Sequence, residues 1–529
     1  MILKLFAMVA ILAAGWDVEM EKAVLTVSGA AEIEELSEEE MERFRSLAAH
    51  PLDINAAGRS RLASSGLFSP FQIEALMEYR DGSGDILSWT ELALVNGFSA
   101  GYVEALKHFV RLESDRAPGE REDRRIRHEA MVRGAVKAEV PGSGAASVKG
   151  SGGLKYGLEW GERAEFHWAT RTTYDEPEPE LGTISAAWYG RRWLGKIVAG
   201  DFAARFGQGL TAWSGFSLSS LTTIQSYRRN GTGLSPTSSF TSTEKGIGAD
   251  FVLGSWTASA AWSFSTGTPY ANVTRTGRSF SAGVTATSKA VSADFKLGLP
   301  SLSIFGEGGW NGRPMGVAGI VWSPEYGRRY GAMAKYTDRK LQAAAGAENP
   351  YFQANFEAKV NYARLTEQYR LRLATSHEFA PGALTLTPAL RLDCKLKPQE
   401  TSPWRTDIRA DLDATLSKWM FHARYDAVFG KAFASAGYLE AGRRSEKTAL
   451  WLRAGLFAVD NWDDRIYIYE RDAPGSFNVP ALYGRGITGS VVGSMHLGRH
   501  TVHLRLAATG YFTGKPGKLE AKVQYSLKL

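Results

Sequence analysis

The stretch LEAKVQYSLKL, residues 519–529, alternates strictly between apolar and polar side chains up to the last residue. Successive side chains of a β-strand point to opposite faces, so this pattern predicts one long strand with an apolar and a polar face. Its length fits a tilted strand that crosses a bilayer, roughly 9 to 11 residues. The stretch therefore predicts a membrane-spanning strand.

The same alternation recurs along most of the chain, at residues 352–362, 384–396, 408–416 and 502–512. A soluble β-sandwich also has alternating strands, but such strands usually run about five or six residues. The longer repeats favour a mainly β fold, a large antiparallel transmembrane β-barrel over residues 128–529. At roughly 20 residues per strand and connection we expect about 20 strands. The last strand should close the barrel against the first, near residues 128–139.

The N-terminus predicts export. Lys4 precedes an apolar run and small residues follow it, so residues 1–15 are typical of a signal peptide. Together with the barrel this predicts an outer-membrane protein whose partners are membrane lipid, lipopolysaccharide and the barrel-assembly machinery. Cys394 is the only cysteine, and no Cys/His cluster has metal-ligand spacing. We therefore expect no metal and no cofactor.

A helical domain is predicted before the barrel, at residues 31–112. Residues 31–49 have helical periodicity, and Ser37 with Glu40 forms a capping-box pattern at the start of a helix. Glycine turns at Gly66 and Gly97 each join a pair of short helices. Residues 113–128 are charged and almost without apolar side chains, which is typical of a solvated linker. We expect this domain to lie in the periplasm.

Short motifs across residues 52–112 resemble the tandem helix-hairpin-helix module of competence-type (ComEA-like) DNA receptors. Further on, four motifs resemble a stretch of Bacteroidetes-type outer-membrane proteins that join such a module to a barrel. The resemblance implies this domain order and says little about activity. The first set is DINAA (53–57), LASSG (62–66), QIE (72–74), YR (79–80) and ELALVNGF (91–98); the second is GDF (200–202), FGQGL (206–210), WSGF (213–216) and EKG (244–246).

In the DNA-binding form of that module, the backbone N–H groups of a Gly-apolar-Gly hairpin bind a phosphate. Here Phe68 and Ser99 occupy the second glycine positions. Residues 31–112 carry 14 acidic and 7 basic side chains, whereas phosphate binding uses clustered cations. DNA binding is therefore disfavoured but stays open as an alternative. Its candidate residues are Gly66, Leu67, Phe68, Gly97, Phe98 and Ser99, with Arg59, Arg61 and Lys107 supplying charge.

The barrel must be basic, because the whole chain has a net charge of +6 and the helical domain is acidic. Subtraction leaves about +14 for the barrel, which favours contact with anionic solutes or with lipopolysaccharide phosphates. Residues 217–243 are polar and too long for a tight turn, so they form an extracellular loop or fold into the lumen. The candidate solute-contacting residues in this region are Asp201, Arg205, Gln208, Arg228 and Arg229.

Sequence patterns for catalysis are weak. Residues 97–101 match GxSxG, but that nucleophile turn requires a preceding strand, and here it joins two helices. His500 and His503 are three apart in a strand and must face opposite ways. Asp411 and Asp413 share the lumen face, where electrostatics explains them more simply than acid–base chemistry. We expect no enzyme activity.

The leading functional hypothesis is an outer-membrane channel or transport protein whose helical module docks a periplasmic partner or gates the opening. One alternative is a receptor for DNA uptake, in which the hairpins bind the incoming strand. The other is a structural component of the outer membrane that transports nothing. A barrel of this size encloses enough space for either a pore or a plug.

Overall fold

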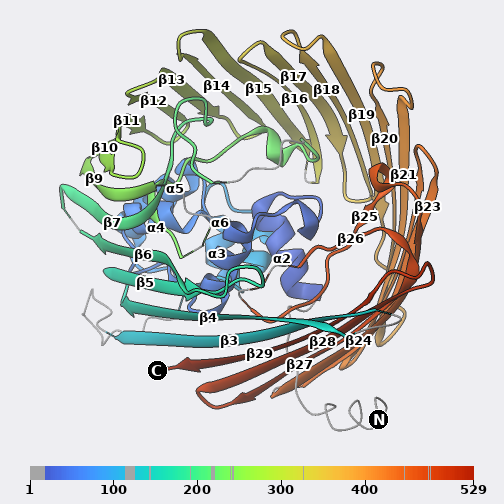
Figure 1. Cartoon of the computed structure of the whole chain (residues 1–529). Coiled ribbons are helices and arrows are strands. Elements are labelled where there is room, and N and C mark those ends of the chain that lie inside the picture. Colours follow the sequence, from blue (N-terminus) through green and yellow to red (C-terminus); the bar gives the residue numbers. More distant parts are fainter. Residues whose placement is uncertain are drawn as a thin grey trace.

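The computed structural model shows a closed β-barrel that surrounds a helical domain (Figure 1). The predicted signal peptide and most of the predicted linker lie outside the described residues. The structure describes residues 18–112, 125–141, 145–190, 192–215, 221–238, 240, 244–325, 327–445, 447–474, 476 and 478–529.

The barrel wall has 24 strands among these residues, and neighbouring strands are antiparallel. A further short strand, β8 (Gly233–Pro236), pairs with β7 inside a long connection. The wall strands are β3 (Ile126–Val140), β4 (Ser147–Trp160), β5 (Ala164–Arg171), β6 (Glu180–Tyr189), β7 (Leu194–Arg205), β9 (Glu244–Leu253), β10 (Trp256–Ser263), β11 (Thr268–Thr276), β12 (Phe280–Thr287), β13 (Val291–Gly298), β14 (Leu302–Trp310), β15 (Pro314–Glu325), β16 (Arg328–Thr337), β17 (Lys340–Glu348), β18 (Phe352–Asn361), β19 (Thr366–Ser376), β20 (Leu384–Leu396), β21 (Trp404–Leu416), β22 (Trp419–Phe429), β23 (Phe433–Arg444), β24 (Thr448–Val459), β27 (Gly484–Leu497), β28 (His500–Tyr511) and β29 (Gly517–Lys528).

The sequence prediction of about 20 strands was too low, because many connections are tight hairpins. Strands β16 and β17 are joined by Asp338 and Arg339 alone, with φ angles of 48° and 61°. Two consecutive positive φ angles are typical of the type I′ turn, whose twist matches that of the flanking strands. Short strands such as β10, with 8 residues, also lower the number of residues used per strand.

The predicted closure of the barrel is confirmed. Strand β29 pairs with β3 from Gly517 opposite Val140 to Lys528 opposite Glu129. Because the number of strands is even, β3 begins and β29 ends at the same end of the barrel, which we call the proximal mouth. The opposite end, the distal mouth, carries the two longest connections, residues 206–243 and 460–483.

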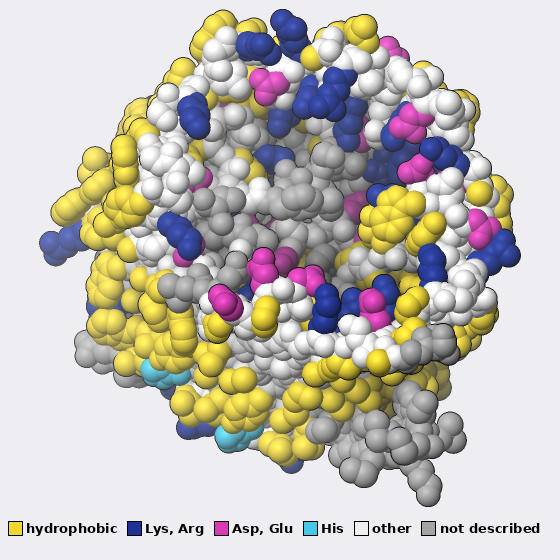
Figure 2. All heavy atoms as spheres, viewed as in Figure 1, with side chains coloured by type: hydrophobic (Ala, Val, Ile, Leu, Met, Phe, Trp, Pro, Cys, Tyr) yellow, Lys and Arg dark blue, Asp and Glu magenta, His cyan; other side chains and the backbone are white. Residues whose placement is uncertain are grey.

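The outer wall is apolar and the lumen is polar, as the alternation predicted. On β29, Val523 is 49% exposed on the outside, whereas the neighbouring Gln524 is fully buried inside. Hydrophobic side chains cover the visible outer surface, and charged ones surround the central hollow (Figure 2). Exposed aromatic residues lie near both mouths, as in the girdles of membrane barrels. Examples are Trp160, Trp188, Trp322 and Trp419 at the proximal end, and Trp262, Trp310, Trp404 and Phe512 at the distal end.

The helical domain lies inside the ring of strands in Figure 1. Within the described residues, no helix combines the length and apolarity needed to cross a membrane. The parallel strands β1 (Leu52–Asp53) and β2 (Val110–Arg111) join the two ends of the hairpin region. The helical elements are α2 (Val18–Ser28), the 3₁₀ turn η1 (Ile33–Glu35), α3 (Glu38–Ala49), α4 (Arg59–Ser65), α5 (Pro70–Ser83), α6 (Trp89–Leu94) and α7 (Ala100–Leu106).

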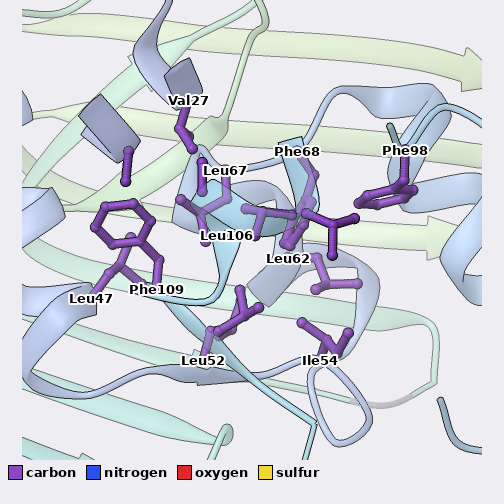
Figure 3. Packing of buried hydrophobic residues seen from close by; sticks show 14 of the residues in the cluster. Val27, Leu47, Leu52, Ile54, Leu62, Leu67, Phe68, Phe98, Leu106 and Phe109 are labelled. Carbon is purple, nitrogen blue, oxygen red and sulfur yellow. The ribbon is translucent and has the colours of Figure 1, made fainter. Parts of the chain in front are cut away.

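The helical domain has its own hydrophobic core. Phe44, Leu62, Leu106 and Phe109 are fully buried in one cluster with side chains from every helix (Figure 3). The predicted capping box is confirmed, because Ser37 accepts from the backbone N–H of Glu40 and the Glu40 carboxylate accepts from that of Ser37. The helix therefore starts at Glu38. Residues 32–35 lie outside α3, so their carboxylates are available to contact the barrel.

Candidate functional site in the barrel lumen

The candidate site is the interface between the helical domain and the lumen wall. The sequence predicted that residues 31–112 form a domain in the periplasm, but in the structure they contact the inside of the barrel. Lys155 of β4 lies 2.7 Å from the carboxylate of Glu42, and Lys196 of β7 donates to Ser64 at 2.6 Å. Cations of the wall such as Lys155 therefore pair with carboxylates on the acidic surface of the domain.

Three carboxylates just before α3, those of Glu32, Glu34 and Glu35, form the densest contact with the wall. We call residues 32–35 the acidic latch. The latch binds arginines from four adjacent wall strands, β19, β20, β21 and β22. Arg372 donates to Glu35 at 2.9 Å, Arg409 to Glu32 at 3.0 Å and Arg424 to Glu34 at 2.8 Å.

The same wall arginines also bind carboxylates of neighbouring strands. Arg372 contacts Asp393 at 3.1 Å, Arg409 contacts Asp426 at 2.7 Å and Arg424 contacts Asp411 at 2.6 Å. Each guanidinium is thus oriented by a wall carboxylate and directs its remaining N–H groups toward the latch. The wall holds these arginines in place, and the latch supplies their second anionic partner.

Electrostatics favours the ionised latch. Burial acts to raise the pKa of Glu34, but the nearby Arg424 and Arg409 outweigh it and lower that pKa to about 2. Glu34 also accepts from the backbone N–H of Tyr469 at 3.2 Å. A carboxylate with this pKa is charged at all physiological pH values, so Glu34 stays ionised.

A second anchor is Arg61 on α4, which lies among three wall carboxylates. Its guanidinium donates to Glu165 at 2.9 Å and to Glu162 at 3.2 Å, and it lies 3.9 Å from Glu159. Burial acts to lower the pKa of Arg61, but these carboxylates together with Tyr189 raise it well above its ordinary value. The cation is therefore permanently charged and ties α4 to β4 and β5.

The hairpin residues predicted to bind DNA phosphate lie in the core and in the turns of the helical domain. Leu67, Phe68 and Phe98 are buried in the core of the helical domain. Gly66 has a φ of 68° and ends α4, and a Cβ there would lie 2.6 Å from the Arg43 guanidinium. Gly66 therefore allows the positive φ of this turn and the close approach of the Arg43 side chain.

The basic members of that set are each paired with a carboxylate. Arg59 binds Glu74 within the helical domain, and Lys107 binds Glu104 one turn away at 2.6 Å. Arg61 is held by the wall, as described above. Gly97 has a φ of 88°, and Ser99 caps α7 by accepting from the backbone N–H of Tyr102 at 3.3 Å. Arg59, Arg61 and Lys107 therefore pair with carboxylates in three separate places and do not form one basic patch.

The long connection after β7 folds into the lumen and carries most of the predicted solute-contacting residues. The backbone N–H of Gln208 donates to Glu307 on β14 at 2.6 Å, and Arg228 donates to Ser303 at 2.9 Å. The Arg229 guanidinium lies 4.7 Å from the ring centroid of Trp213. Of the two sequence alternatives for residues 217–243, the described part, 221–238 and 240, fits the lumen alternative.

Two predicted residues lie at the end of β7. Arg205 binds Glu39 of the helical domain at 2.7 Å, so this segment also contacts α3. Asp201 is buried and accepts from the backbone N–H of Ile184 at 2.8 Å. The predicted residues therefore hold the inward segment and the helical domain together. The arginines of β19 to β22 were missed, although their inward positions on adjacent strands were readable from the alternation.

The second long connection, residues 460–483, also folds inward. It contains η3 (Trp462–Asp464), β25 (Ile466–Tyr467) and β26 (Ala481–Leu482). Arg471 joins the wall to the helical domain, because it donates to Glu440 at 2.7 Å and to Glu21 of α2 at 2.8 Å. Both inward segments start at the distal mouth, so the helical domain is covered from that side.

Two cavities lie beside the helical domain. The proximal cavity, about 820 Å³, is lined by residues of α3 such as Arg45 and by wall residues near the chain termini such as Glu129. The distal cavity, about 1010 Å³, is lined by the latch and by Arg372, Arg391 and Arg409. Residues of α2 and α3 thus line the proximal cavity, and the latch lines the distal one.

The described residues hold no cluster of three or more His, Cys, Asp and Glu side chains placed to bind a metal ion. His503 faces the lumen and is buried, whereas His500 contacts Tyr525 on the outer face, so the two face opposite ways. Asp411 accepts from Arg424, and His422 contacts Asp413 at 2.6 Å. These groups form ion pairs of the wall.

The apolar outer wall, the aromatic girdles and the filled lumen define the class: a membrane-spanning β-barrel with an internal plug. No protein-family model matches the chain, and no curated protein is significantly similar to it.

Solved structures give a distant likeness. The outer membrane protein OpdK from Pseudomonas aeruginosa is 10% identical, with a TM-score of 0.33 over 77% of this chain and 99% of that one. OccAB4 from Acinetobacter baumannii is 9% identical, with a TM-score of 0.31 over 76% and 98%. OccK9 (OpdG) from Pseudomonas aeruginosa is 11% identical, with a TM-score of 0.32 over 76% and 98%. These scores are too low to carry an argument, and the strand pairing itself defines the barrel.

Proposed function

We propose that this protein is an outer-membrane transport protein whose helical domain is a plug that gates the lumen. The observation that carries the proposal is the acidic latch, which binds four arginines of the wall from inside the barrel. Barrels of about 22 strands have plugged lumens in transporters, whereas 16 to 18 strands leave open pores. A barrel of 24 strands is wide enough to need such a plug.

The proximal mouth would face the periplasm. Both barrel termini lie there, and the two longest connections lie at the other end, which matches the short periplasmic turns and long external loops of such barrels. A solute arriving from outside would meet the two inward segments first and then the latch.

Planar-bilayer conductance of the full chain tests the proposal. The wild-type protein should be silent, because the plug and the two inward segments fill the lumen. The variant Glu32→Gln/Glu34→Gln/Glu35→Gln should show discrete openings, because it leaves several buried guanidinium groups without their second anionic partner, at about 3–5 kcal/mol for each broken buried pair.

The matched control is Glu104→Gln, which removes an exposed carboxylate paired with Lys107 inside the helical domain. It should stay as silent as the wild type. A wild-type barrel that conducts freely would contradict the plug. Silence of the triple variant, with the latch shown to be released by hydrogen exchange, would contradict gating by this domain and favour a structural component that transports nothing.

A second candidate role is docking of a periplasmic protein partner. Leu87, two residues before α6, and Leu94, the last residue of α6, are 82% and 81% exposed. This part of the domain lies near the proximal mouth, where Glu78 of α5 pairs with Arg278 in the β11–β12 turn. Two exposed leucines that flank this short helical segment favour an apolar contact with a partner.

Docking is tested by Leu87→Ser/Leu94→Ser. Uptake of the transported solute by growing cells should fall, while the conductance of the purified protein should not change. Equal uptake by the variant and the wild type would exclude this surface.

The DNA-receptor alternative gains no support from the lumen, because Arg59, Arg61 and Lys107 are all paired with carboxylates. We expect the full-length protein to show no salt-dependent DNA binding. Micromolar binding that weakens steeply with salt would revive the alternative. Contact with lipopolysaccharide and recognition of β29 by the assembly machinery stay predictions.

A further inference from the structure

The distal cavity has a charge balance that depends on the plug. Among the described residues that line it are nine Lys and Arg side chains and nine Asp and Glu side chains. Three of these nine carboxylates, Glu32, Glu34 and Glu35, belong to the latch. When the latch leaves, the wall of the cavity keeps an excess of three cations. Such an excess in a partly enclosed space must attract anions from solution.

The arginines around Glu32 are arranged to bind an anion with several acceptor groups. Arg409 donates to Glu32 at 3.0 Å, Arg372 lies 3.8 Å from the same carboxylate, and Arg391 also contacts it. The buried Nε of Arg391 has no hydrogen-bond acceptor among the described residues. Planar guanidinium groups bind carboxylate and phosphate oxygens in pairs. The site therefore has donor capacity that the latch alone does not use.

We propose that the distal cavity is a binding site for a multivalent anion, bearing carboxylate or phosphate groups, that competes with the acidic latch for Arg372, Arg391 and Arg409. The inference deepens the transport function proposed above and rests on it: the transported or signalling solute would be such an anion. The latch occupies the site in the resting protein and takes the place of the ligand.

Multivalency follows from how the latch is held. Its carboxylates are tethered to the plug, so their effective concentration at the arginines is high. A monovalent anion replaces one hydrogen-bonded pair at a time and leaves the other latch contacts in place. An anion with three or more charged oxygens can engage several arginines together. The cavity volume of about 1010 Å³ leaves room for a ligand of several such groups.

Isothermal titration calorimetry of the full-length protein tests the proposal, with citrate and tripolyphosphate in separate arms at constant ionic strength. The two arms distinguish carboxylate from phosphate ligands, and sodium chloride is the monovalent control. We expect saturable binding of at least one multivalent anion. Hydrogen exchange of residues 31–50 should rise in the presence of that anion.

Two substitutions in the site are expected to change the anion affinity in opposite directions. Glu32→Gln removes the competing carboxylate, so anion affinity should increase by about 10-fold, the size of one charge-assisted hydrogen bond. Arg409→Gln removes a donor and should weaken binding by a similar factor. The control Glu104→Gln should leave the affinity unchanged. An increase caused by Glu32→Gln cannot come from general misfolding, which would weaken binding.

Two results would overturn the proposal: no saturable binding of either anion to the wild type or to Glu32→Gln, or equal exchange of residues 31–50 in chloride and in the multivalent anions. The second result would show that salt only screens the latch. Binding with a silent barrel in planar bilayers would instead leave the anion site in place and contradict the transport function, so the two failures are distinguishable.

Discussion

Two sectors of the lumen wall solve the same problem of polar burial in different ways. In the hydroxyl sector, β10 to β13, most inward side chains are small, apart from Tyr270 and Lys296. Several of the small ones bond within the wall: Asn272 donates to Thr285 at 3.0 Å, and Ser292 donates to Glu307 of β14 at 2.6 Å. In the arginine sector, β19 to β24, long cations bind a wall carboxylate and also reach the plug. Arg424 pairs with Asp411 of the wall and donates to Glu34 of the latch at 2.8 Å.

The difference shows that the plug is attached asymmetrically. Small hydroxyl groups satisfy one another at short range, and this sector binds the plug at its rim, where Arg278 pairs with Glu78 of α5. Arginines carry several donors on a long stem, so one guanidinium can join two elements at once. We infer that the arginine sector and the Arg61 anchor contribute more of the charged contacts that hold the plug than the hydroxyl sector does.

The largest expected effect is that of Arg61→Ala. It leaves Glu159, Glu162 and Glu165 buried without their cation, so the free energy of local opening of residues 53–112 should fall by about 3–5 kcal/mol. Hydrogen exchange measured by mass spectrometry reports this. Arg59→Ala, which removes an ion pair inside the helical domain, should lower it by only about 1 kcal/mol. Equal effects of the two variants would show that the wall does not anchor α4.

The next effect is a pH dependence of the latch. The pKa of Glu34 is lowered in the folded state to about 2, so its contribution is fully present above the ordinary glutamate pKa of 4.5 and is lost as the pH falls from there toward 2. Protection of residues 31–50 from hydrogen exchange should therefore fall as the pH is lowered across this window. The fall should be smaller in the variant Glu34→Gln. The same pH profile in both proteins would assign the loss to other carboxylates.

A smaller effect is expected for Glu307→Gln on β14, which tests the edge of the hydroxyl sector. Glu307 accepts from the backbone N–H groups of Gln208 and Leu210 and from the hydroxyl of Ser292. Hydrogen bonds to a charged acceptor contribute about 1.5–3 kcal/mol each, and the amide retains part of them. Limited proteolysis of residues 206–238 should speed up, while exchange at the latch should stay unchanged. Faster exchange at the latch would couple the inward segment to the plug.

The smallest effect is expected for Thr285→Val in the hydroxyl sector. It removes one acceptor of Asn272, whose side chain also donates to the carbonyl of Val284 at 3.2 Å. The barrel should lose about 0.5–1 kcal/mol of stability in thermal unfolding, and protection of the plug should equal that of the wild type. A loss of plug protection would mean that this sector also holds the plug, and the comparison above would fail.

Alternation predicted the barrel from sequence because side chains of a strand repeat every two residues whatever surrounds them. It placed Gln524 inside and Val523 outside, and it gave the closing strand. Trp451 of β24 faces the lumen, where Arg471 stacks on its ring at 3.9 Å from the centroid. The pattern tells which face a residue takes relative to its neighbours and cannot tell what fills the lumen.

The acidic helical domain and the basic barrel were also readable from the sequence, since charge is a sum over residues. The contact between these two oppositely charged parts could not be read from the sequence. Glu34 and Arg424 are 390 positions apart, and their contact depends on how the closed wall and the inward segments place the plug. The sequence by itself determined the strands, the helices and the opposite charges of the two parts. Only the tertiary structure decided that these charges meet inside the barrel, because ion pairs between distant segments depend on distances of a few ångströms that no local pattern encodes.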